Sequence, residues 1–170
     1  VIDSVSSNLY YQAEEKGLKI KVINNLDFDY YDGDNIRLTQ VLLNLVGNAI
    51  KFSGKGEILI VVKQKKNCNY LSFSVTDSGI GMNSVDVSNA FSRYSQFGKS
   101  SNSKELGTGL GLSICKEIIE AQKGVIKIES EYKKGTKVSF TLPYSRSINL
   151  PEPIEVKSNN DFEEINILTI

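Results

Sequence analysis

The fold is decided by residues 34–52, which read DNIRLTQVLLNLVGNAIKF. This stretch is predicted to form one helix, with Asp34 or Asn35 as the N-cap and Gly54 as the stop signal. At about 100° per residue, its polar side chains fall within an arc of roughly 80°; they are Arg37, Gln40, Asn44, Asn48 and Lys51. Apolar residues cover most of the remaining surface, so the helix should be largely enclosed. Buried polar groups need partners, so the stripe must face either protein or a polar ligand.

The composition is that of an ordinary globular domain. The chain has 170 residues, 40% of them hydrophobic, with 20 basic and 20 acidic residues and no net charge. That length is sufficient for one domain with a sizeable core. The charge balance argues against a nucleic-acid-binding protein, which needs clustered positive charge. No apolar run is long enough to span a membrane and no signal peptide is recognisable. The chain begins without Met, so we expect it to be part of a longer protein.

Cysteine and histidine usage narrows the chemistry. Cys68 and Cys115 occur without a CxxC motif, which is typical of a reducing intracellular compartment. The chain has no histidine. Structural zinc sites and a histidine-based catalytic triad within this chain are therefore excluded. A phosphate-handling site built from Asn, Asp, Lys and backbone amides needs no histidine.

Hydrophobic periodicity predicts the other elements. Helices are expected over residues 1–16 and after the glycine loop at 106–112, the latter ended by Gly124, with a partly helical segment at 84–97. The second of these helices carries Leu110, Ile114, Ile118 and Ala121 on one line, with Cys115 and Ile119 beside it. Strands are expected over 18–23, 57–65, 70–77, 125–131 and 136–142, with a short strand at 28–31. Hairpin connections are predicted at 66–69 and 133–135.

Two polar side chains are in phase with the core faces of their strands. Asp77 follows Phe73 and Val75 at intervals of two residues, so its carboxylate should leave the strand end on the core side. A half-buried carboxylate needs hydrogen-bond donors. Thr136 is in phase with Val138, so its hydroxyl should also point inward.

Glycine-containing loops occur at 79–81, at 107–111 and at Gly135. The second loop opens a helix, where free amides and the positive end of the helix dipole favour phosphate. It matches neither the P-loop nor the Rossmann fingerprint, and each loop alone is explained by a turn. The preceding residues, 98–105, contain no apolar side chain, which indicates a mobile loop.

The combination is more informative than any single motif. An amide oxygen can ligate Mg²⁺, and a lysine can neutralise phosphate as a point charge. A carboxylate that accepts a hydrogen bond from an exocyclic amine would select adenine. The polar stripe of the helix, Asp77, Thr136 and the glycine loop therefore indicate an ATP–Mg²⁺ site.

These residues resemble the motifs of sensor histidine kinases. Residues 34–52 are similar to the N box, Asp77-Ser78-Gly79-Ile80-Gly81 to the first glycine box and Gly107-Thr108-Gly109-Leu110-Gly111-Leu112 to the second. Phe91 with Tyr94 and Gln96 is similar to the F box, and Gly135-Thr136 to the last glycine motif. The resemblance covers residues 1–144. It implies an α/β sandwich, also found in gyrase, the large ATP-dependent heat-shock chaperone and MutL, with a mixed, mostly antiparallel sheet of about five strands under about three helices.

The resemblance also implies roles. Asn48 would hold Mg²⁺ on the ATP phosphates, with Asn44 close by and Lys51 on phosphate. Asp77 would accept from the adenine amine, partly through water and supported by Thr136, and Gly79 and Gly81 would let the base approach. The adenine pocket wall would include Ile80, Leu112 and Phe140. The second glycine box would contact the nucleotide through Gly107, Thr108, Gly109, Leu110, Gly111 and Leu112, and residues 92–108 would form the ATP lid.

Alternatives remain at several positions. Asn44 and Asn48 could be core amides satisfied by protein. Phe91, Tyr94 and Phe97 could be only a hydrophobic anchor for the lid. Lys99, Lys104, Arg37 and Gln40 are interpreted as surface residues.

The expected function is transfer of the ATP γ-phosphoryl group to a histidine outside this chain. The alternative is an ATP-hydrolysing clamp of the gyrase, chaperone or MutL kind. Those clamps place a glutamate general base four residues before the Mg²⁺-binding asparagine, where this chain has Asn44. An amide cannot take the proton, which favours the kinase. A domain that binds nucleotide without reacting is the third possibility.

The resemblance implies partners for this chain. They are a dimerisation domain with the acceptor histidine and a response-regulator receiver domain; no nucleic-acid or membrane contact is expected, and the isolated domain should be monomeric. Residues 145–170 are interpreted as a linker, leading to a truncated receiver domain if the parent is a hybrid kinase. A cytoplasmic location is expected, whether or not the parent protein is membrane-anchored.

Overall fold

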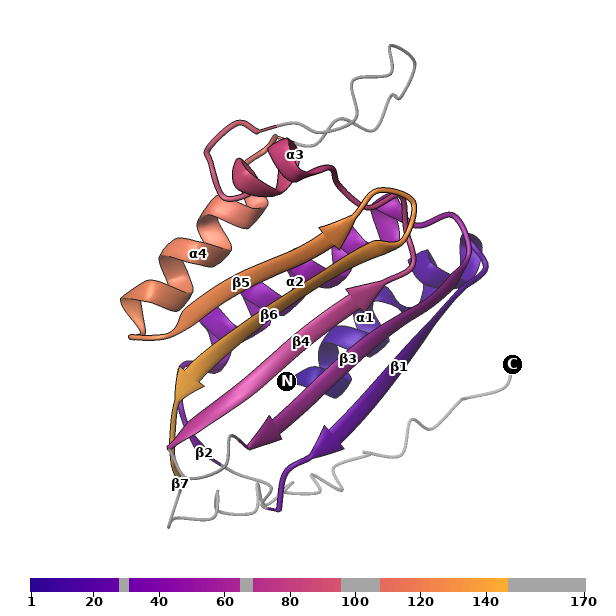
Figure 1. Ribbon diagram of the computed structural model, residues 1–170. Helices are drawn as coiled ribbons and strands as arrows, with labels where there is room; N and C mark the ends of the chain where they lie inside the picture. Colours follow the sequence, from indigo (N-terminus) through magenta and orange to yellow (C-terminus); the bar gives the residue numbers. More distant parts are fainter. Residues whose placement is uncertain (28–30, 65–68, 96–107, 147–170) are drawn as a thin grey trace, which may run out of the picture.

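A five-stranded sheet covered on one face by helices forms the body of the protein (Figure 1). The structure is a computed structural model that describes residues 1–27, 31–64, 69–95 and 108–146. In chain order the elements are α1 (Ile2–Glu15), β1 (Leu18–Asn25), β2 (Tyr31–Asp32), α2 (Asn35–Phe52), β3 (Gly56–Gln64), β4 (Tyr70–Asp77), α3 (Ser84–Ser88), α4 (Gly111–Ala121), β5 (Val125–Glu131), β6 (Gly135–Pro143) and β7 (Ser145–Arg146).

The sheet is mixed, with strand order β1-β3-β4-β6-β5. Strands β1 and β3 pair in parallel, because α2 crosses between them, and every other pair in this sheet is antiparallel. Helices α1, α2 and α4 lie against the same face (Figure 1). The predicted α/β sandwich, with a mostly antiparallel sheet under three helices, is therefore confirmed.

Helix α2 is enclosed as predicted. It begins at the N-cap Asp34, whose Oδ1 accepts a hydrogen bond from the Arg37 amide at 2.9 Å. Its buried residues lie between α1, α4 and the sheet; they are Leu38, Val41, Leu42, Leu45, Val46, Ala49 and Ile50. Burying such side chains contributes about 1.5–3 kcal/mol each. Asn44 and Asn48 are half-buried, so this part of the polar stripe is partly enclosed, whereas Arg37 at its beginning is exposed.

Three in-register rows of residues run across β4, β6 and β5 on the helix-covered face. The row deepest in the core contains Phe73 and Phe140, whose rings stack with centroids 4.8 Å apart. The next row is Val75, Val138 and Ile128. The last row is polar: Asp77, Thr136 and Ser130. The apolar packing thus ends in a line of polar side chains at one edge of the core.

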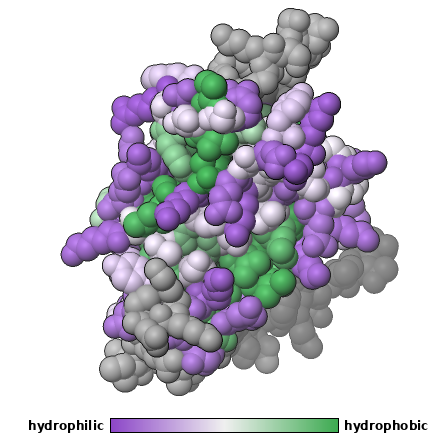
Figure 2. Space-filling view, viewed as in Figure 1, coloured by the Kyte–Doolittle hydropathy of each residue, from purple (hydrophilic) through white to green (hydrophobic). Residues whose placement is uncertain are grey.

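The opposite face of the sheet is not covered by the described helices. Its half-buried and exposed positions carry mostly Lys, Ser and Thr, with Leu59 and Val61 among them. Figure 2, viewed toward this face, shows hydrophilic side chains spread over the sheet with hydrophobic atoms between them.

Several predicted segments differ from the structure or lie outside it. The helical part of 84–97 is limited to α3, and turns follow it. In α4 the buried line is Cys115 and Ile119, whereas Ala121 is exposed. Ser145–Arg146, assigned to the linker, pair with β2 as a second small sheet. Residues 28–30 of the short strand and 65–68 of the first hairpin lie outside the described residues, as do 96–107, most of the expected lid.

Gly135 provides a test of the close packing at the polar edge. Its φ is +104°, and a Cβ atom there would lie 2.0 Å from the Asp77 carbonyl oxygen. Gly135→Ala should therefore destabilise the fold by roughly 2–4 kcal/mol in urea unfolding. Gly47→Ala is the control, because no atom lies within 4 Å of a Cβ at that helical position. That variant should gain about 0.5–1 kcal/mol; equal effects of the two substitutions would contradict the packing argument.

Candidate functional site

A pocket opens between α2 and the polar edge of the sheet. Most of its lining is apolar, and its polar side chains come from Asn48, Asp77 and Thr136. The complete lining is Leu45, Asn48, Ala49, Phe52, Val75, Asp77, Ile80, Gly81, Met82, Leu112, Ile128, Thr136 and Val138. A mostly apolar pocket with a few convergent polar groups is the usual form of a small-molecule site.

Asp77 is placed by the end of β4, where strand alternation turns its carboxylate inward as predicted. Its Oδ1 accepts hydrogen bonds from the amides of Gly79, at 2.8 Å, and Thr136, at 3.3 Å. Burial raises the pKa of Asp77 above its ordinary value, and the two amide hydrogen bonds lower it by less. Both bonds end on Oδ1, so Oδ2 can accept a donor from a ligand in the pocket.

Ser130 also belongs to this polar edge, although it is part of none of the sequence motifs described above. Its Oγ accepts a hydrogen bond from the Met82 amide at 2.8 Å, donates to the Gly135 carbonyl at 2.9 Å and lies 2.9 Å from Thr136 Oγ1. What marks Ser130 as a site residue is its position directly opposite Thr136 in the β5–β6 pairing. Detecting it would have required the pairing of β5 with β6.

The first glycine loop is held between α2 and the β5–β6 turn through Ile80. The Ile80 amide donates to the Phe52 carbonyl at the end of α2, at 3.1 Å, and the Ile80 carbonyl accepts from the Lys133 amide at 2.6 Å. A Cβ atom at Gly79 would lie 2.4 Å from the same Phe52 oxygen. Gly79 therefore has no side chain because the loop must lie close to α2. The expected reason was different, namely that Gly79 lets the adenine base approach the loop.

The N-terminus of α4 lies beside the polar stripe of α2. A Cβ atom on Gly111 would be 3.7 Å from Asn48 Nδ2 and 3.8 Å from Asn44 Oδ1. No side chain caps this helix end at Leu110, so its first amides remain available as donors. Free amides and the positive end of the helix dipole together favour an anion.

Asn44 is partly engaged by protein. Its side chain lies within reach of the Cys115 thiol, which donates to the Val41 carbonyl at 3.9 Å. Burial raises the pKa of Cys115 to about 12, while the hydrogen bond from Asn44 acts in the lowering direction. The amide of Asn44 is therefore fixed against α4.

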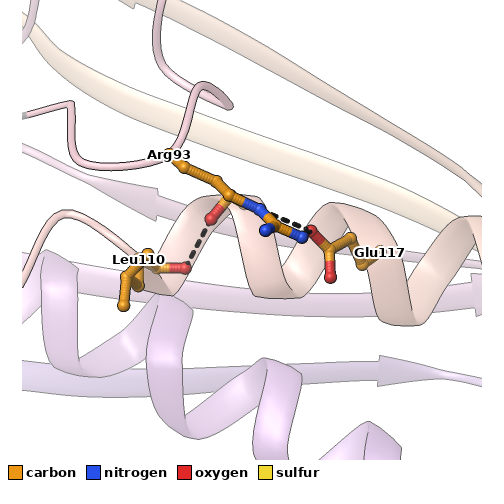
Figure 3. A network of polar contacts seen from close by, with 4 residues as sticks. Arg93, Leu110 and Glu117 are labelled. Carbon is orange, nitrogen blue, oxygen red and sulfur yellow. Dashed lines mark hydrogen bonds and ion pairs between the residues drawn. The ribbon is translucent and has the colours of Figure 1, made fainter.

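The two ends of the expected lid are joined in the structure. The Tyr94 amide donates to the Gly109 carbonyl at 3.0 Å, which closes the chain on either side of residues 96–107. Arg93 anchors the same segment to α4, since its Nη2 lies 2.7 Å from Glu117 Oε1 (Figure 3). Both side chains are exposed, so solvent screens this ion pair and it contributes little to stability.

The remaining predicted site residues are distributed around the pocket. Ile80 and Leu112 line it, as expected. Phe140 does not: it is 1% exposed and stacks on Phe73 in the core, and Val138 occupies the wall position. Lys51 does not line the pocket, but its Nζ lies 5.1 Å from the centroid of the Phe52 ring, which does. Thr108, Gly109 and Leu110 lead into α4, and Gly107 lies outside the described residues.

Metal-ligand clusters and membrane-spanning helices are both absent from the described part of the chain. No group of three or more His, Cys, Asp or Glu side chains there could hold a metal ion. Among the same residues, no helix is both long and apolar enough to cross a membrane.

Residues 33–146 match the family described as "Histidine kinase-, DNA gyrase B-, and HSP90-like ATPase". The chain is 35% identical to hybrid signal transduction histidine kinase C of Dictyostelium discoideum, a match that covers 100% of this chain and 14% of that protein. It is 40% identical to sensor histidine kinase WalK of Bacillus subtilis (strain 168), covering 74% of this chain and 21% of that protein. The chain thus spans only a small part of these relatives.

Solved structures show the same similarity. Full-length ShkA, solved in complex with AMPPNP, matches with a TM-score of 0.75 and 28% identity, covering 85% of this chain and 29% of that one. The catalytic domain of histidine kinase ThkA matches with a TM-score of 0.70 and 27% identity, covering 84% of this chain and 89% of that one.

The raised pKa of Asp77 predicts a pH-dependent stability difference. Between pH 3.8 and the raised pKa of the folded state, the Asp77 carboxyl holds a proton more tightly in the folded protein than in the unfolded chain. The free energy of unfolding therefore falls as pH rises through that window. Asp77→Asn keeps an oxygen for the two amides but cannot ionise. Its stability relative to the wild type should therefore increase with pH across the window, as measured by urea unfolding. A relative stability that falls with pH would show that the pKa is lowered instead.

Proposed function

Because the chain belongs to the histidine kinase-, DNA gyrase B- and HSP90-like ATPase family, we propose that it binds ATP and transfers the γ-phosphoryl group to a histidine outside this chain. The related proteins named as sensor and hybrid histidine kinases support the kinase branch of the family. The observation that carries the proposal is the pocket's polarity, with hydrogen-bond acceptors at one end and donors at the other.

The acceptor end fits a purine amine. Asp77 Oδ2 has room to accept from the exocyclic amine of adenine, and the apolar walls from Val75, Val138 and Leu112 fit the faces of the base. Burial of an aromatic ring between such walls is favourable. In this proposal Asp77 positions the adenine, and Thr136 supports it through the amide that donates to Asp77.

The donor end fits phosphate. The uncapped first turn of α4 offers backbone amides. We assign Lys51, three residues after Asn48 on α2, to phosphate through its positive charge. Phosphoryl transfer depends mainly on positioning and charge neutralisation, so these groups are the ones that the reaction needs from the protein. We assign Gly109, Gly111 and the neighbouring residues of the second glycine box to contact with the phosphates.

The residues present also fit Mg²⁺. This ion is usually held by one or two protein oxygens together with substrate phosphates, not by a dedicated cage of side chains. Asn48 and Asn44 both lie beside the α4 N-terminus, and the side-chain amide of Asn48 carries an oxygen that can ligate the ion. When bound, Mg²⁺ would neutralise charge on the phosphates. Asn48 would be the residue that holds it.

An ATP-hydrolysing clamp is the competing function. Clamps of that kind need a general base at the position of Asn44, and an amide cannot accept the proton. The Asn44 side chain moreover lies beside the buried Cys115, on the side of α2 that faces α4. This arrangement favours phosphoryl transfer, in which the acceptor histidine itself supplies the nucleophile.

The parent protein would supply the missing parts. We propose that residues 1–144 form the catalytic domain and that a cytoplasmic dimerisation domain brings the acceptor histidine to it. A response-regulator receiver domain would then take the phosphoryl group. The relatives that are hybrid kinases make additional domains in the same chain reasonable.

Substitution of Asn48 tests the Mg²⁺ assignment. Asn48→Ala should weaken Mg²⁺-dependent ATP binding at least roughly tenfold, since a charge-assisted contact is lost. Isothermal titration with and without Mg²⁺ measures this change. Gln40→Ala is the matched control, because Gln40 lies on the same stripe but outside the pocket lining. Equal Mg²⁺ dependence in Asn48→Ala and the wild type would refute the assignment.

A transfer assay tests the reaction itself. With γ-labelled ATP and a supplied histidine-containing acceptor domain, label should appear on the acceptor, and Asn48→Ala should abolish it. Free phosphate should be released only slowly when no acceptor is present. Rapid phosphate release with no labelled acceptor would instead support the ATP-hydrolysing clamp.

A further inference from the structure

The hydrogen bonds of Ser130 determine the direction of the one that joins it to Thr136. A serine hydroxyl has one hydrogen and two lone pairs. The Met82 amide and the Gly135 carbonyl are both within hydrogen-bond distance of Ser130 Oγ, at 2.8 and 2.9 Å. An amide can only donate and a carbonyl can only accept, so the single hydrogen of Ser130 goes to Gly135.

The hydroxyl of Thr136 must therefore donate to Ser130. The two oxygens are 2.9 Å apart, and Ser130 has only a lone pair left for this contact. The Met82, Gly135 and Thr136 contacts of Ser130 can all be hydrogen bonds at the same time only if the Thr136 hydroxyl is the donor. Thr136 lines the pocket, and its Oγ1 can therefore only accept a hydrogen bond from a ligand there, because its own hydrogen goes to Ser130.

Asp77 and Thr136 then present the same polarity to a ligand. They lie directly opposite each other in the register of β4 and β6, and the ionised carboxylate of Asp77 has only acceptors. A ligand group at this edge, or a water that bridges to it, must donate hydrogen bonds. An exocyclic amine does so, whereas a carbonyl oxygen at the same ring position places a third acceptor beside two others.

We propose that Ser130 is a positioning residue that sets base specificity, by holding the Thr136 hydroxyl as an acceptor so that the pocket takes an aminopurine and rejects an oxopurine. This inference rests on the proposed nucleotide-binding function and deepens it. The three residues Asp77, Thr136 and Ser130 form one in-register row across β4, β6 and β5, so the row acts as one recognition unit.

The test compares ATP with inosine triphosphate, which carries a carbonyl oxygen in place of the adenine amine. Isothermal titration of this chain with each nucleotide and Mg²⁺ gives two dissociation constants and their ratio. In Ser130→Ala the Thr136 hydroxyl is free to rotate and donate to the carbonyl. The preference for ATP over inosine triphosphate should then fall roughly tenfold, the value of about one hydrogen bond.

Two comparisons separate this role from a purely structural one. In a Thr136→Val background, which has no hydroxyl to orient, adding Ser130→Ala should change the preference by less than about twofold. Ser139→Ala is the matched control. Ser139, on β6, is half-buried like Ser130 but lies on the other face of the sheet, so its substitution should not change the preference for ATP. Ser130→Cys keeps the packing with a weaker hydrogen-bonding group and replaces Ser130→Ala if that variant does not fold.

The outcomes are distinct. A fall in affinity for both nucleotides by the same factor in Ser130→Ala or Ser130→Cys would overturn the inference and leave ATP binding intact. An effect of Ser130→Ala that persists in the Thr136→Val background would also overturn it. A wild-type chain that binds neither nucleotide would overturn the proposed function itself.

Discussion

The half-buried carboxylate of Asp77 is the constraint on which the site depends. Burial disfavours its charge, so it must be surrounded by donors, and the first glycine loop and the β6 strand supply them through the Gly79 and Thr136 amides. These contacts require the loop to approach α2 and Gly135 to lie against the Asp77 backbone. The packing of three separate parts of the chain is thus tied to one side chain, which stays available to a ligand through its second oxygen.

Helix α2 connects the two ends of the pocket. Its last carbonyl, at Phe52, receives the Ile80 amide at the acceptor end. Asn44 and Asn48 lie beside the α4 N-terminus at the donor end. One helix therefore fixes the distance between the carboxylate end of the pocket and the end where the α4 amides favour an anion. A ligand with an amine at one end and phosphates at the other matches this division.

Sequence patterns predicted most of the fold correctly, because strand and helix periods are local properties. Strands β4 and β5 have the predicted bounds, and the N-cap at Asp34 is confirmed by its hydrogen bond. Hydrophobic periodicity predicted burial less well where two neighbouring lines of one helix were similarly apolar. In α4 the predicted line ending at Ala121 proved less buried than Cys115 and Ile119, since the packing partner and not the period decides between neighbouring lines. The family resemblance assigned Phe140 to the pocket wall, but its position farther along β6 from Thr136 puts it in the core, stacked on Phe73.

The sequence by itself determined that a polar stripe runs along an enclosed helix, that Asp77 and Thr136 point to the core side and that glycine loops flank them. Residue types and periods of two and 3.6 carry that information. Only the tertiary structure decided that Asp77, Thr136 and Ser130 form one row, because strand register depends on pairing between distant segments. It also decided that Asn44 lies beside Cys115 and that the α4 N-terminus meets the polar stripe of α2. These contacts join residues far apart in the chain, so no local pattern specifies them.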